Sequence, residues 1–570
     1  MEIAEIKDIL LDCKHISEVE IKECGLFHGK SYSWIIHCKL DVLNRWIPIV
    51  IGIPQNWKLN LFDFYLIGEI PFIPHIDTYG KLCLFNLEGV LIYPDFRGLF
   101  NTCVTKAIHI ISDGLLGKNR HDFLQEFDSY IGQLSDIVIA NVALPRDKKS
   151  QNIKICKIGS NEKRRKNESY AQFKTRTRKI RCFASVNQRD FKTWGIQNTQ
   201  ENGLYFFIEP SHYIYPPNIF ENKIDEFLND ILSFVDIADF KKMIRKCSKS
   251  LVLIFEILQD KDTINSCGFI IDEANFSFED KIRLISFTKI QPILINRIDE
   301  EYMSNRTSFS SENIGEKSIL LVGCGSIGGY VFHDLIKSGF KNITLVDDDL
   351  MNPENVYRHF LGIESVFSYK AKALENYAKK TVAELNIKTI IDKIEYALDD
   401  YDLDFNDFDY IVSAIGNHTT NQWINEYAIE KNIDKTFFYI WNEPLDIGCH
   451  VARINLKDIG NYQDIFLVND NGVIDLSSYA LSNQSFAKNY SGCNGSFIPY
   501  GSSLSVESSV MFLNLLKREI EGQVNANLLA SKKGNDYYFE KAGFLVSNRY
   551  TTQCEQYVEV EFDKLKEVSI

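Results

Sequence analysis

Residues 318–328 read SILLVGCGSIG, and this stretch decides the fold of the C-terminal half. Its apolar beginning predicts a buried strand, and the periodicity of residues 327–338 predicts a helix. Three glycines stand between them in the spacing G-x-G-x-x-G. A strand, a glycine-rich turn and a helix in this order bring backbone amides and a helix N-terminus close to a phosphate group. The candidate nucleotide-binding residues are Gly323, Gly325 and Gly328.

The same alternation of elements continues downstream. Strands are predicted at 342–346, 408–415 and 436–441, with helices at 370–385 and 419–431 between them. Strands that alternate with crossover helices predict a mostly parallel, doubly wound sheet whose ligand lies at the carboxyl ends of the strands. Asp347 ends one of these strands, where a carboxylate can accept hydrogen bonds from ribose hydroxyls. An NAD dehydrogenase and an ATP enzyme both fit this much of the pattern.

The segment 346–359, VDDDLMNPENVYRH, favours the ATP enzyme. Asn355 and Arg358 follow Asp347 by eight and eleven positions, and Lys370 comes twelve after Arg358. An amide donor and two cations together offset the charge of a triphosphate and of its transition state. A dehydrogenase has no need for three such groups after its ribose acid. Adenylation is therefore the preferred chemistry.

This arrangement resembles the adenylation domain of the ubiquitin-activating and ThiF/MoeB superfamily. The resemblance implies a Rossmann-like domain over residues 301–570 that binds ATP. It places Asp347 on the ribose and Asn355, Arg358 and Lys370 on the phosphates, and it gives Arg358 and Lys370 a catalytic role as well. Arg297 or Arg306 is an alternative further phosphate contact, and either is equally well explained as a surface charge.

Mg²⁺ is expected with ATP, but the sequence leaves its protein ligand open. The superfamily commonly has an aspartate after the fourth strand, and Gly416 stands at that position here. The metal would then depend on the phosphates, water and either Asp349 or Asp347. No metal ligand is assigned.

The chain has 13 cysteines and no Cys-x-x-Cys pair, which is typical of reduced thiols in a cytoplasmic protein and gives no zinc ribbon. Cys493, in the loop sequence Gly-Cys-Asn-Gly, is the candidate for a thiol that accepts an acyl group. Cys449 and Cys554 are the alternatives. With the run 439–450 and the later Pro-Tyr-Gly at 499–501, this region resembles the activating domain of bacterial conjugating and activating fusion proteins from type II CBASS anti-phage operons.

Residues 74–84, PHIDTYGKLCL, resemble the active-site segment of ubiquitin-conjugating enzymes. Cys83 stands at the position of the catalytic cysteine, and His75 stands where the eukaryotic enzymes have asparagine. An imidazole there would donate a hydrogen bond to a developing oxyanion or order the loop. Taken alone, a buried thiol and a structural histidine explain both residues equally well. Residues 1–145 are predicted to form an α+β domain of this type.

The predicted organisation is thus multidomain, α+β followed by α/β. A basic linker is predicted over 146–180, because residues 146–181 carry 14 Lys and Arg against three acidic residues. A middle α+β domain is predicted over 181–300. The net charge of −14 disfavours general binding to nucleic acid, and no apolar run is long enough for a membrane span.

By this resemblance, the chain activates the C-terminus of a partner protein and conjugates it to a target lysine through thioesters on Cys493 and then Cys83. In the family the partner is a cGAS-like nucleotidyltransferase (CD-NTase), and the adenylation domain forms a homodimer. Two alternatives remain open. One is a sulfur-carrier adenylyltransferase in which Cys83 is incidental, and the other is a scaffold that binds nucleotide without transferring an acyl group.

Overall fold

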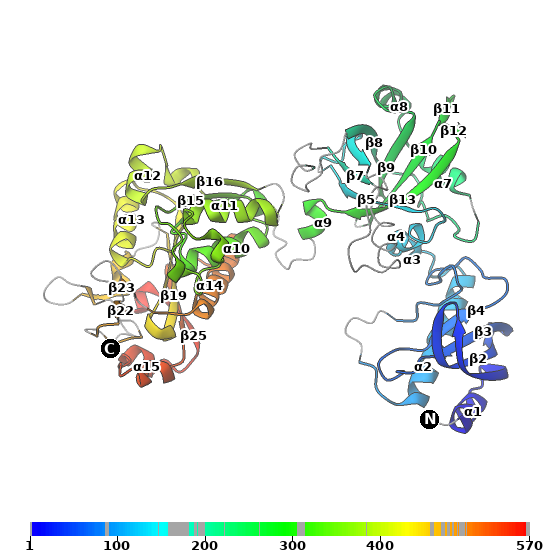
Figure 1. Cartoon of the computed structure of the whole chain (residues 1–570), viewed down its shortest axis with the longest axis horizontal. Coiled ribbons are helices and arrows are strands. Elements are labelled where there is room, and N and C mark those ends of the chain that lie inside the picture. Colours follow the sequence, from blue (N-terminus) through cyan, green and yellow to red (C-terminus); the bar gives the residue numbers. More distant parts are fainter. Residues whose placement is uncertain are drawn as a thin grey trace. The chain divides into compact units, whose positions relative to one another are not determined.

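The computed structural model describes most of the chain: residues 3–85, 91–145, 147–157, 182–186, 191, 200–221, 223–261, 263–304, 314–382, 385–455, 461–468, 474–475, 479–481, 484–486, 488–489, 496–497 and 499–565. These residues form two compact units, Met1–Met303 and Ser304–Ile570. Each unit is described by itself below (Figure 1). No helix among the described residues has the length and apolar character that crossing a bilayer requires.

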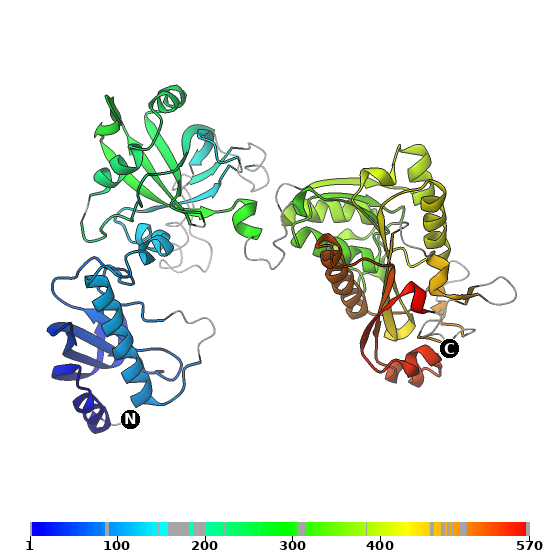
Figure 2. The same cartoon turned by 180° about the vertical axis from the view of Figure 1, so that it is seen from behind.

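The first unit begins with a four-stranded antiparallel sheet in which neighbours in sequence are neighbours in space. Alternate residues of its second strand, from Ile36 to Val42, are buried. They pack against the long helix α2, which crosses one face of the sheet (Figure 2). The elements are α1 (Ile3–Asp12), β1 (Ile16–Phe27), β2 (Lys30–Val42), β3 (Arg45–Ile53), β4 (Asp63–Leu66) and α2 (Phe96–Leu115).

Two short helices follow, α3 (Asp122–Gln125) and α4 (Phe127–Ile131). The break falls at Glu126, whose φ and ψ of −99° and 12° are not helical. The side chain of Glu126 is thereby turned toward the loop that carries His75, which accounts for the interruption of an otherwise helical sequence.

A closed barrel completes the first unit, in the order β10-β13-β5-β7-β6-β8-β9. Its strands are β5 (Val138–Ala143), β6 (Gln151–Lys157), β7 (Cys182–Ser185), β8 (Gln200–Ile208), β9 (Ser250–Leu258), β10 (Ile264–Asp272) and β13 (Lys289–Arg297). Outside the barrel lie α7 (Ile224–Leu232), α8 (Ile237–Ile244), β11 (Asn275–Phe278), β12 (Ile282–Ser286) and α9 (Glu300–Ser304).

The barrel corrects the predicted domain boundaries. β5 lies inside the segment 1–145 that was assigned to the N-terminal domain, and β6 lies inside the predicted linker 146–180. The polar residues and lysines of β6 make it look like part of a basic linker in the sequence. In the structure Ile153 and Ile155 of this strand are buried in the barrel. Most of the remaining linker lies outside the described residues.

The second unit is built on an eight-stranded sheet in the order β16-β15-β14-β17-β18-β19-β24-β25. The five strands from β16 to β18 are parallel, as predicted for the Rossmann-like part, and the last three are antiparallel. The strands are β14 (Ser318–Val322), β15 (Asn342–Val346), β16 (Asn386–Ile390), β17 (Tyr410–Ser413), β18 (Thr436–Asn442), β19 (Gly448–Asn455), β24 (Leu528–Lys533) and β25 (Tyr557–Glu561). β16 and the antiparallel extension were not predicted.

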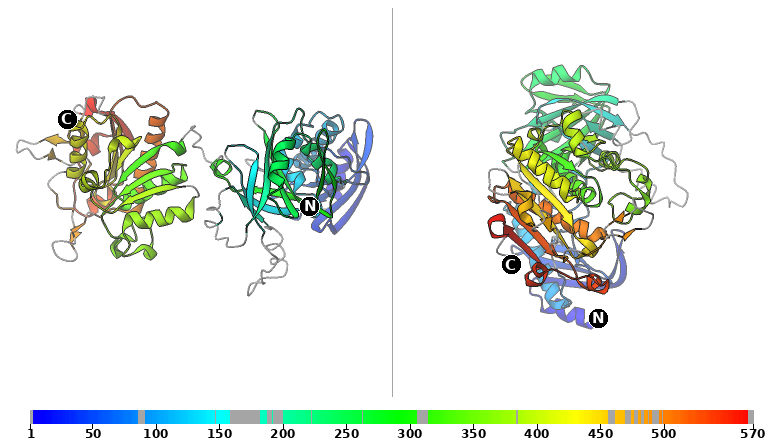
Figure 3. Two further views of the ribbon diagram at one scale, coloured as in Figure 1. Left: turned by 90° about the horizontal axis from the view of Figure 1, so that it is seen from above. Right: turned by 90° about the vertical axis from the view of Figure 1, so that its left-hand side faces the viewer.

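Helices cover both faces of this sheet and bury a separate core on each (Figure 3). One core involves α10 (Ser326–Lys337), α11 (Lys370–Thr381) and α14 (Ser502–Ile520). The other involves α12 (Ile394–Asp400) and α13 (His418–Glu430). Two short helices near the end of the chain are α15 (Tyr537–Lys541) and α16 (Asn548–Thr552). Because helices cover both faces of the sheet, a ligand would bind at the carboxyl ends of the parallel strands.

Candidate functional site

The glycine-rich turn between β14 and α10 is fixed by close packing of the backbone. Gly323 has φ +91°, and a Cβ atom at Gly328 would lie 1.9 Å from the carbonyl oxygen of Gly323. Both positions therefore require glycine. A Cβ at Gly325 would meet nothing within 4 Å, so this residue leaves space in front of the N-terminus of α10. That space is where an anion would meet the helix.

A cavity of about 410 Å³ lies at the carboxyl ends of β14, β15 and β17. The predicted nucleotide-binding residues come together around it: Gly323, Gly325, Asp347, Asp349, Asn355, Arg358 and Lys370. Gly328 is one turn further along α10 and shapes the glycine-rich turn. The size and the mixture of donors suit a nucleotide, which is consistent with the sequence prediction.

Asp347 joins the glycine-rich turn to the second strand. Its Oδ2 accepts a hydrogen bond of 2.6 Å from the backbone amide of Cys324, and its Oδ1 accepts one of 2.9 Å from the amide of Asp349. Burial raises the pKa of Asp347, while these two amides lower it. The carboxylate is thus held in place, and each oxygen keeps a second lone pair that can accept from a ligand hydroxyl.

Two of the three cations that line the cavity, Lys370 and Arg358, differ in how their charge is balanced. Lys370 begins α11, is largely buried, and its Nζ lies 2.7 Å from Oδ2 of Asp349. Arg358 forms no ion pair with any described residue, and its guanidinium lies 5.5 Å from the centre of the Tyr500 ring. A half-buried cation without a carboxylate partner is suited to binding a phosphate. Asn355 is oriented by the backbone amide of Asn352, which donates to its Oδ1 over 3.0 Å.

Sequence reasoning missed His359, which fastens the Arg358 segment to the glycine-rich turn. Its Nε2 lies 2.7 Å from the carbonyl oxygen of Cys324, and its Nδ1 accepts from the amide of Leu361 over 3.0 Å. Burial lowers the pKa of His359 to about 4, so the ring is neutral and donates through Nε2. His359 stands directly after Arg358 in the segment 346–359, and this position was the feature of the sequence that could have identified it.

Helix α14 also contacts a residue that lines the cavity, which the sequence did not indicate. Ser326, the first residue of α10, donates to the carbonyl oxygen of Arg358 over 2.5 Å and lies 2.9 Å from the hydroxyl of Ser505. Tyr500, just before α14, lines the cavity. Helix α14 therefore supports the same turn that the sequence motif identified.

The acidic groups near the cavity determine which protein ligands Mg²⁺ could have. Among the described residues no group of three or more His, Cys, Asp or Glu side chains could hold a metal ion. Asp347 is engaged by backbone amides and Asp349 by Lys370. The donors present fit a cation that is held mainly by phosphate oxygens and water, with one of these carboxylates beside it.

The two arginines proposed as further phosphate contacts are Arg297, which belongs to the barrel, and Arg306. Arg297 ends β13 in the barrel of the first unit, where its guanidinium pairs with Asp299 at 2.7 and 2.9 Å. Its charge is already balanced there and its side chain is 16% exposed, so Arg297 is an ion-paired residue of the barrel and not a surface charge. Arg306 is not among the described residues.

Cys83 opens onto a second cavity, of about 440 Å³, in the first unit. The residue is exposed, and its backbone amide donates to the carbonyl oxygen of His75 over 2.8 Å. Burial of the sulfur and the charge of Glu126 raise the pKa of Cys83. The prediction of a merely buried thiol is therefore wrong, since the side chain is accessible to a reagent or a substrate.

His75 lies between two carboxylates. Its Nδ1 is 2.7 Å from Oε1 of Glu126, and its Nε2 is 3.0 Å from Oδ2 of Asp122. The hydrogen bond to Glu126 is the main cause that raises the pKa of His75, against the effect of burial. Both ring nitrogens are occupied, so the structure favours the loop-ordering role over donation to an oxyanion. Asp122 and Glu126 were not predicted as part of this site.

The candidate acyl-accepting cysteines of the second unit are separated by their exposure. Cys493 lies outside the described residues. Cys449 is completely buried in β19, and burial raises its pKa to about 12, so it is no nucleophile in this fold. Cys554 is exposed, and its thiol lies 3.7 Å from the carbonyl oxygen of Thr552.

Comparison with known proteins agrees with this geometry. The model of the ThiF family matches residues 300–517. The Rossmann-like part of the fold prediction is thereby confirmed for the C-terminal half, where the parallel strands carry the glycine-rich turn.

The chain is also similar to curated relatives. It is 25% identical over 256 residues to the ATP-dependent ubiquitin transferase-like protein Cap2 of Pseudomonas aeruginosa, covering 41% of this chain and 44% of that protein. It is 36% identical over 98 residues to Cap2 of Escherichia coli, covering 16% and 17%. It is 32% identical over 123 residues to the NEDD8-activating enzyme E1 catalytic subunit of Arabidopsis thaliana, covering 21% and 26%. The resemblance to the bacterial fusion proteins is confirmed.

Each of these matches spans less than half the length of the relative. Among solved structures, the crystal structure of E. coli MccB with a MccA peptide variant aligns with 16% identity and a TM-score of 0.32. That alignment covers 44% of this chain and 65% of MccB.

Proposed function

We propose that this protein activates the C-terminal carboxylate of a partner protein with ATP and transfers it through two cysteines to an amine. The observation that carries the proposal is the cavity that Arg358, without a carboxylate partner among the described residues, lines together with the glycine-rich turn. The ThiF domain and the ubiquitin transferase-like relatives support it.

The first step is adenylation. The carboxylate oxygen of the partner attacks the α-phosphorus of ATP, a new P–O bond forms, and the bond to pyrophosphate breaks. Arg358, Lys370 and the amide of Asn355 offset the negative charge that builds on the phosphates. Asp347 accepts from the ribose. Mg²⁺, bound with the nucleotide, supplies further charge compensation.

The later steps are acyl transfers between thiols. The thiolate of Cys493 attacks the acyl carbon, a C–S bond forms, and AMP leaves as its C–O bond breaks. The thiolate of Cys83 then displaces Cys493, and a lysine amine finally displaces Cys83 to give an amide. In this proposal residues 1–145 contribute a ubiquitin-conjugating-like domain, with the first strand of the barrel near its end. His75 orders the loop of Cys83.

The partner and the assembly are also proposals. By the CBASS resemblance, the activated C-terminus belongs to a CD-NTase, and the adenylation domain forms a homodimer in the cytoplasm. No interaction with nucleic acid or membrane enters the proposed reaction.

The test is mass spectrometry of the full chain mixed with ATP, Mg²⁺ and the CD-NTase of the same operon. Wild type should form the conjugate. Cys493→Ala should form the adenylate and no thioester, and Cys83→Ala should stop with the acyl group on Cys493. Cys103→Ala is the matched control, because Cys103 is buried in α2 of the same domain as Cys83. Conjugation by both cysteine variants at the wild-type rate would contradict the assignments. Adenylate without any thioester in wild type would favour the sulfur-carrier alternative.

A further inference from the structure

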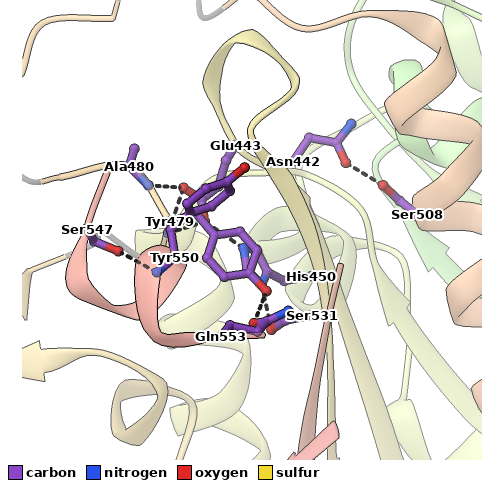
Figure 4. Close-up of polar contacts among 10 residues, drawn as sticks. All are labelled: Asn442, Glu443, His450, Tyr479, Ala480, Ser508, Ser531, Ser547, Tyr550 and Gln553. Carbon is purple, nitrogen blue, oxygen red and sulfur yellow. Dashed lines mark hydrogen bonds and ion pairs between the residues drawn. The ribbon is translucent and has the colours of Figure 1, made fainter. Parts of the chain in front are cut away.

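Two of the buried carboxylates, Glu443 in the second unit and Asp63 in the first, are held in different ways. Glu443 accepts hydrogen bonds of 2.8 Å from the backbone amides of Tyr479 and Ala480, and its Oε1 lies 2.6 Å from Nε2 of His450 (Figure 4). These four residues are not among the described residues that line the two cavities. Glu443 therefore stabilises the fold. Asp63, by contrast, lines the cavity of the first unit.

The carboxylate of Asp63 is shared by two lysines. Its Oδ1 lies 2.9 Å from Nζ of Lys81, and its Oδ2 pairs with Lys30 and accepts from the hydroxyl of Tyr32 over 2.7 Å. Burial acts to raise the pKa of Asp63, but the hydrogen bonds from Lys30, Tyr32 and Lys81 lower it overall, so the side chain is ionised. Two lysines and one carboxylate leave one positive charge in excess. Both lysines line the cavity, so this charge faces whatever enters it.

Lys81 and Cys83 lie on one face of the same extended segment. The amide of Leu82 donates to the carbonyl oxygen of Phe64 in β4 over 2.8 Å, and the amide of Cys83 donates to the carbonyl oxygen of His75 over 2.8 Å. Leu82 is 2% exposed, whereas Cys83 is exposed, which is the alternation expected of an extended chain. Backbone bonds on both sides thus fix the segment, and its ammonium and its thiol open onto the same cavity.

Two charged groups of the cavity act on the thiol in opposite directions. Burial is the main cause that raises the pKa of Cys83, and the charge of Glu126 raises it further, whereas the charge of Lys81 lowers it. Burial acts to lower the pKa of Lys81 itself, but its bond to Asp63 raises it overall, so the ammonium stays charged. Among the described residues, the contact with Asp63 engages one of its three N–H donors. The charged groups that line the cavity are Lys30, Asp63, His75, Asp77, Lys81 and Glu126.

His75 does not offer a comparable donor to the reacting atoms. Its two ring nitrogens lie 2.7 Å from Glu126 and 3.0 Å from Asp122. A group that stabilises a developing oxyanion must aim a donor or a positive charge at the oxygen. In this cavity the excess charge beside Lys81 is available for that purpose.

We propose that Lys81 is a catalytic residue, whose ammonium stabilises the Cys83 thiolate and the oxyanion of acyl transfer, with Asp63 as its positioning residue. This inference rests on the proposed function. When a lysine attacks the Cys83 thioester as the free amine, a C–N bond forms and the carbonyl electron pair moves to oxygen. The oxyanion then collapses, the C–S bond breaks with its electron pair on sulfur, and the nitrogen gives a proton to water. The oxyanion and the departing thiolate are both anions, so one cation favours both steps.

The first test is alkylation of the full chain by iodoacetamide, which needs no partner protein. Lys81→Gln should lower the rate at Cys83 about threefold or more at pH 8 and shift the pH profile of the rate upward, because the thiolate loses a neighbouring cation. Lys81→Arg keeps the charge and should stay within about twofold of wild type. Lys39→Gln is the matched control, since Lys39 pairs with Glu18 on the same sheet and is not among the residues that line the cavity.

Local unfolding cannot imitate the expected result of this test. A loosened segment would expose the thiol and speed alkylation, whereas loss of the cation should slow it. A rate in Lys81→Gln equal to wild type, or an equal fall in Lys39→Gln, would overturn the proposal.

The second test measures discharge of the Cys83 thioester. The chain is loaded with the CD-NTase of the operon, ATP and Mg²⁺, freed of ATP and mixed with free lysine. Lys81→Gln should slow the discharge about tenfold or more, because the transition state loses a cation, and Lys81→Arg should restore it to within about threefold of wild type. Asp63→Asn should give a smaller loss, because Lys81 keeps its charge and loses its ionised partner. Hydrogen exchange in β2 checks that the first unit stays folded in each variant.

The proposed function and the role of Lys81 fail in different ways. A wild type that forms no thioester on Cys83 would refute the proposed transfer and the part of Lys81 in it, and the alkylation rates would still show whether Lys81 acts on the thiol. A wild type that discharges its thioester no faster than Lys81→Gln would leave the proposed function standing and remove Lys81 from the catalytic residues.

Discussion

His75 lies beside Cys83, and His359 lies beside the glycine-rich turn. The two histidines occupy similar places in their sites, yet their surroundings shift their pKa values in opposite directions. Two carboxylates flank His75, and they raise its pKa. His359 is enclosed by backbone groups, and burial lowers its pKa to about 4. The protonated form of the ring is thus favoured at His75 by its two carboxylate neighbours and disfavoured at His359 by burial.

This difference matches the charges each cavity would meet. At the proposed triphosphate cavity the uncharged ring of His359 adds no charge, and the cations that line the cavity are Arg358, Lys370 and Lys393. In the proposed function the Cys83 cavity receives a lysine amine, and Glu126, which lines it, would attract that cation. The same residue type therefore holds a loop in both sites, but its pKa is lowered in the nucleotide site and raised in the Cys83 site.

Replacing Arg358 gives the largest expected effect. Arg358→Ala should lower pyrophosphate exchange about 1000-fold or more, because the transition state loses a cation in a half-buried site. The fold should be retained, since no ion pair of Arg358 with a described residue is lost. Lys372→Ala is the control, because Lys372 lies on α11 and pairs with Glu375 away from the cavity. Exchange above one tenth of wild type would remove Arg358 from the site.

Thiol reactivity compares the two sites directly. Cys83 is exposed and Cys324 in the glycine-rich turn is completely buried, so iodoacetamide should alkylate Cys83 about 100-fold faster at pH 8. The rate at Cys83 should still rise above pH 9, because burial and Glu126 raise its pKa and the thiolate is the reacting form. Peptide mass spectrometry measures both rates. A plateau below pH 8 at Cys83 would contradict this description of the site.

Two glycines of the turn should separate stability from ligand binding. Gly328→Ala should destabilise the second unit by about 3 kcal/mol or more, since its Cβ would overlap the carbonyl oxygen of Gly323. Gly325→Ala should change stability by less than about 1 kcal/mol and weaken ATP, because its Cβ would enter the open space before α10. Urea unfolding and ATP titration distinguish them. Equal stability losses would show that Gly325 is a packing residue.

The smallest effect is in the pH dependence of stability. A histidine whose folded pKa is about 4 destabilises the folded state as the pH falls below 6.5, so His359 should cost the second unit about 2 kcal/mol between pH 7 and pH 5. For His75, whose pKa is raised, the contribution is present below pH 6.5 and is lost as the pH rises through the folded pKa. The rate of hydrogen exchange in β14 reports the stability of the second unit, and the rate in β2 reports that of the first unit. His359→Gln should flatten the acid loss in β14, and His75→Gln should leave β14 unchanged. The same slope in both variants would contradict the assignment.

The sequence predicted the parallel half of the large sheet well, for a physical reason. Strands buried on both faces are continuous apolar runs, and β14 and β15 were predicted at their observed bounds. The donors around the nucleotide cavity followed from spacing along one segment. His359, Tyr500 and Ser505 did not, because their roles depend on contacts between residues distant in sequence or on burial that spacing does not reveal.

The barrel and the acidic partners of His75 were beyond sequence reasoning for the same cause. β6 and β7 are short, and the charges near them outweigh their few buried residues. Asp122 begins α3 and Glu126 lies between α3 and α4, some 50 positions from His75, where the sequence alone suggests solvent-exposed helix charges. Only the fold shows that they meet.

The pairing of β5 with β13 has a consequence for synthesis of the chain. The two strands lie side by side although Asn141 and Asn296, which are bonded across them, stand 155 positions apart. On the ribosome, β5 must wait with its edge unpaired until Arg297 has emerged, and edges of this kind are open to wrong pairing in the meantime. Completion of the barrel should therefore be a late event, reached only as translation of the nucleotide-binding half begins.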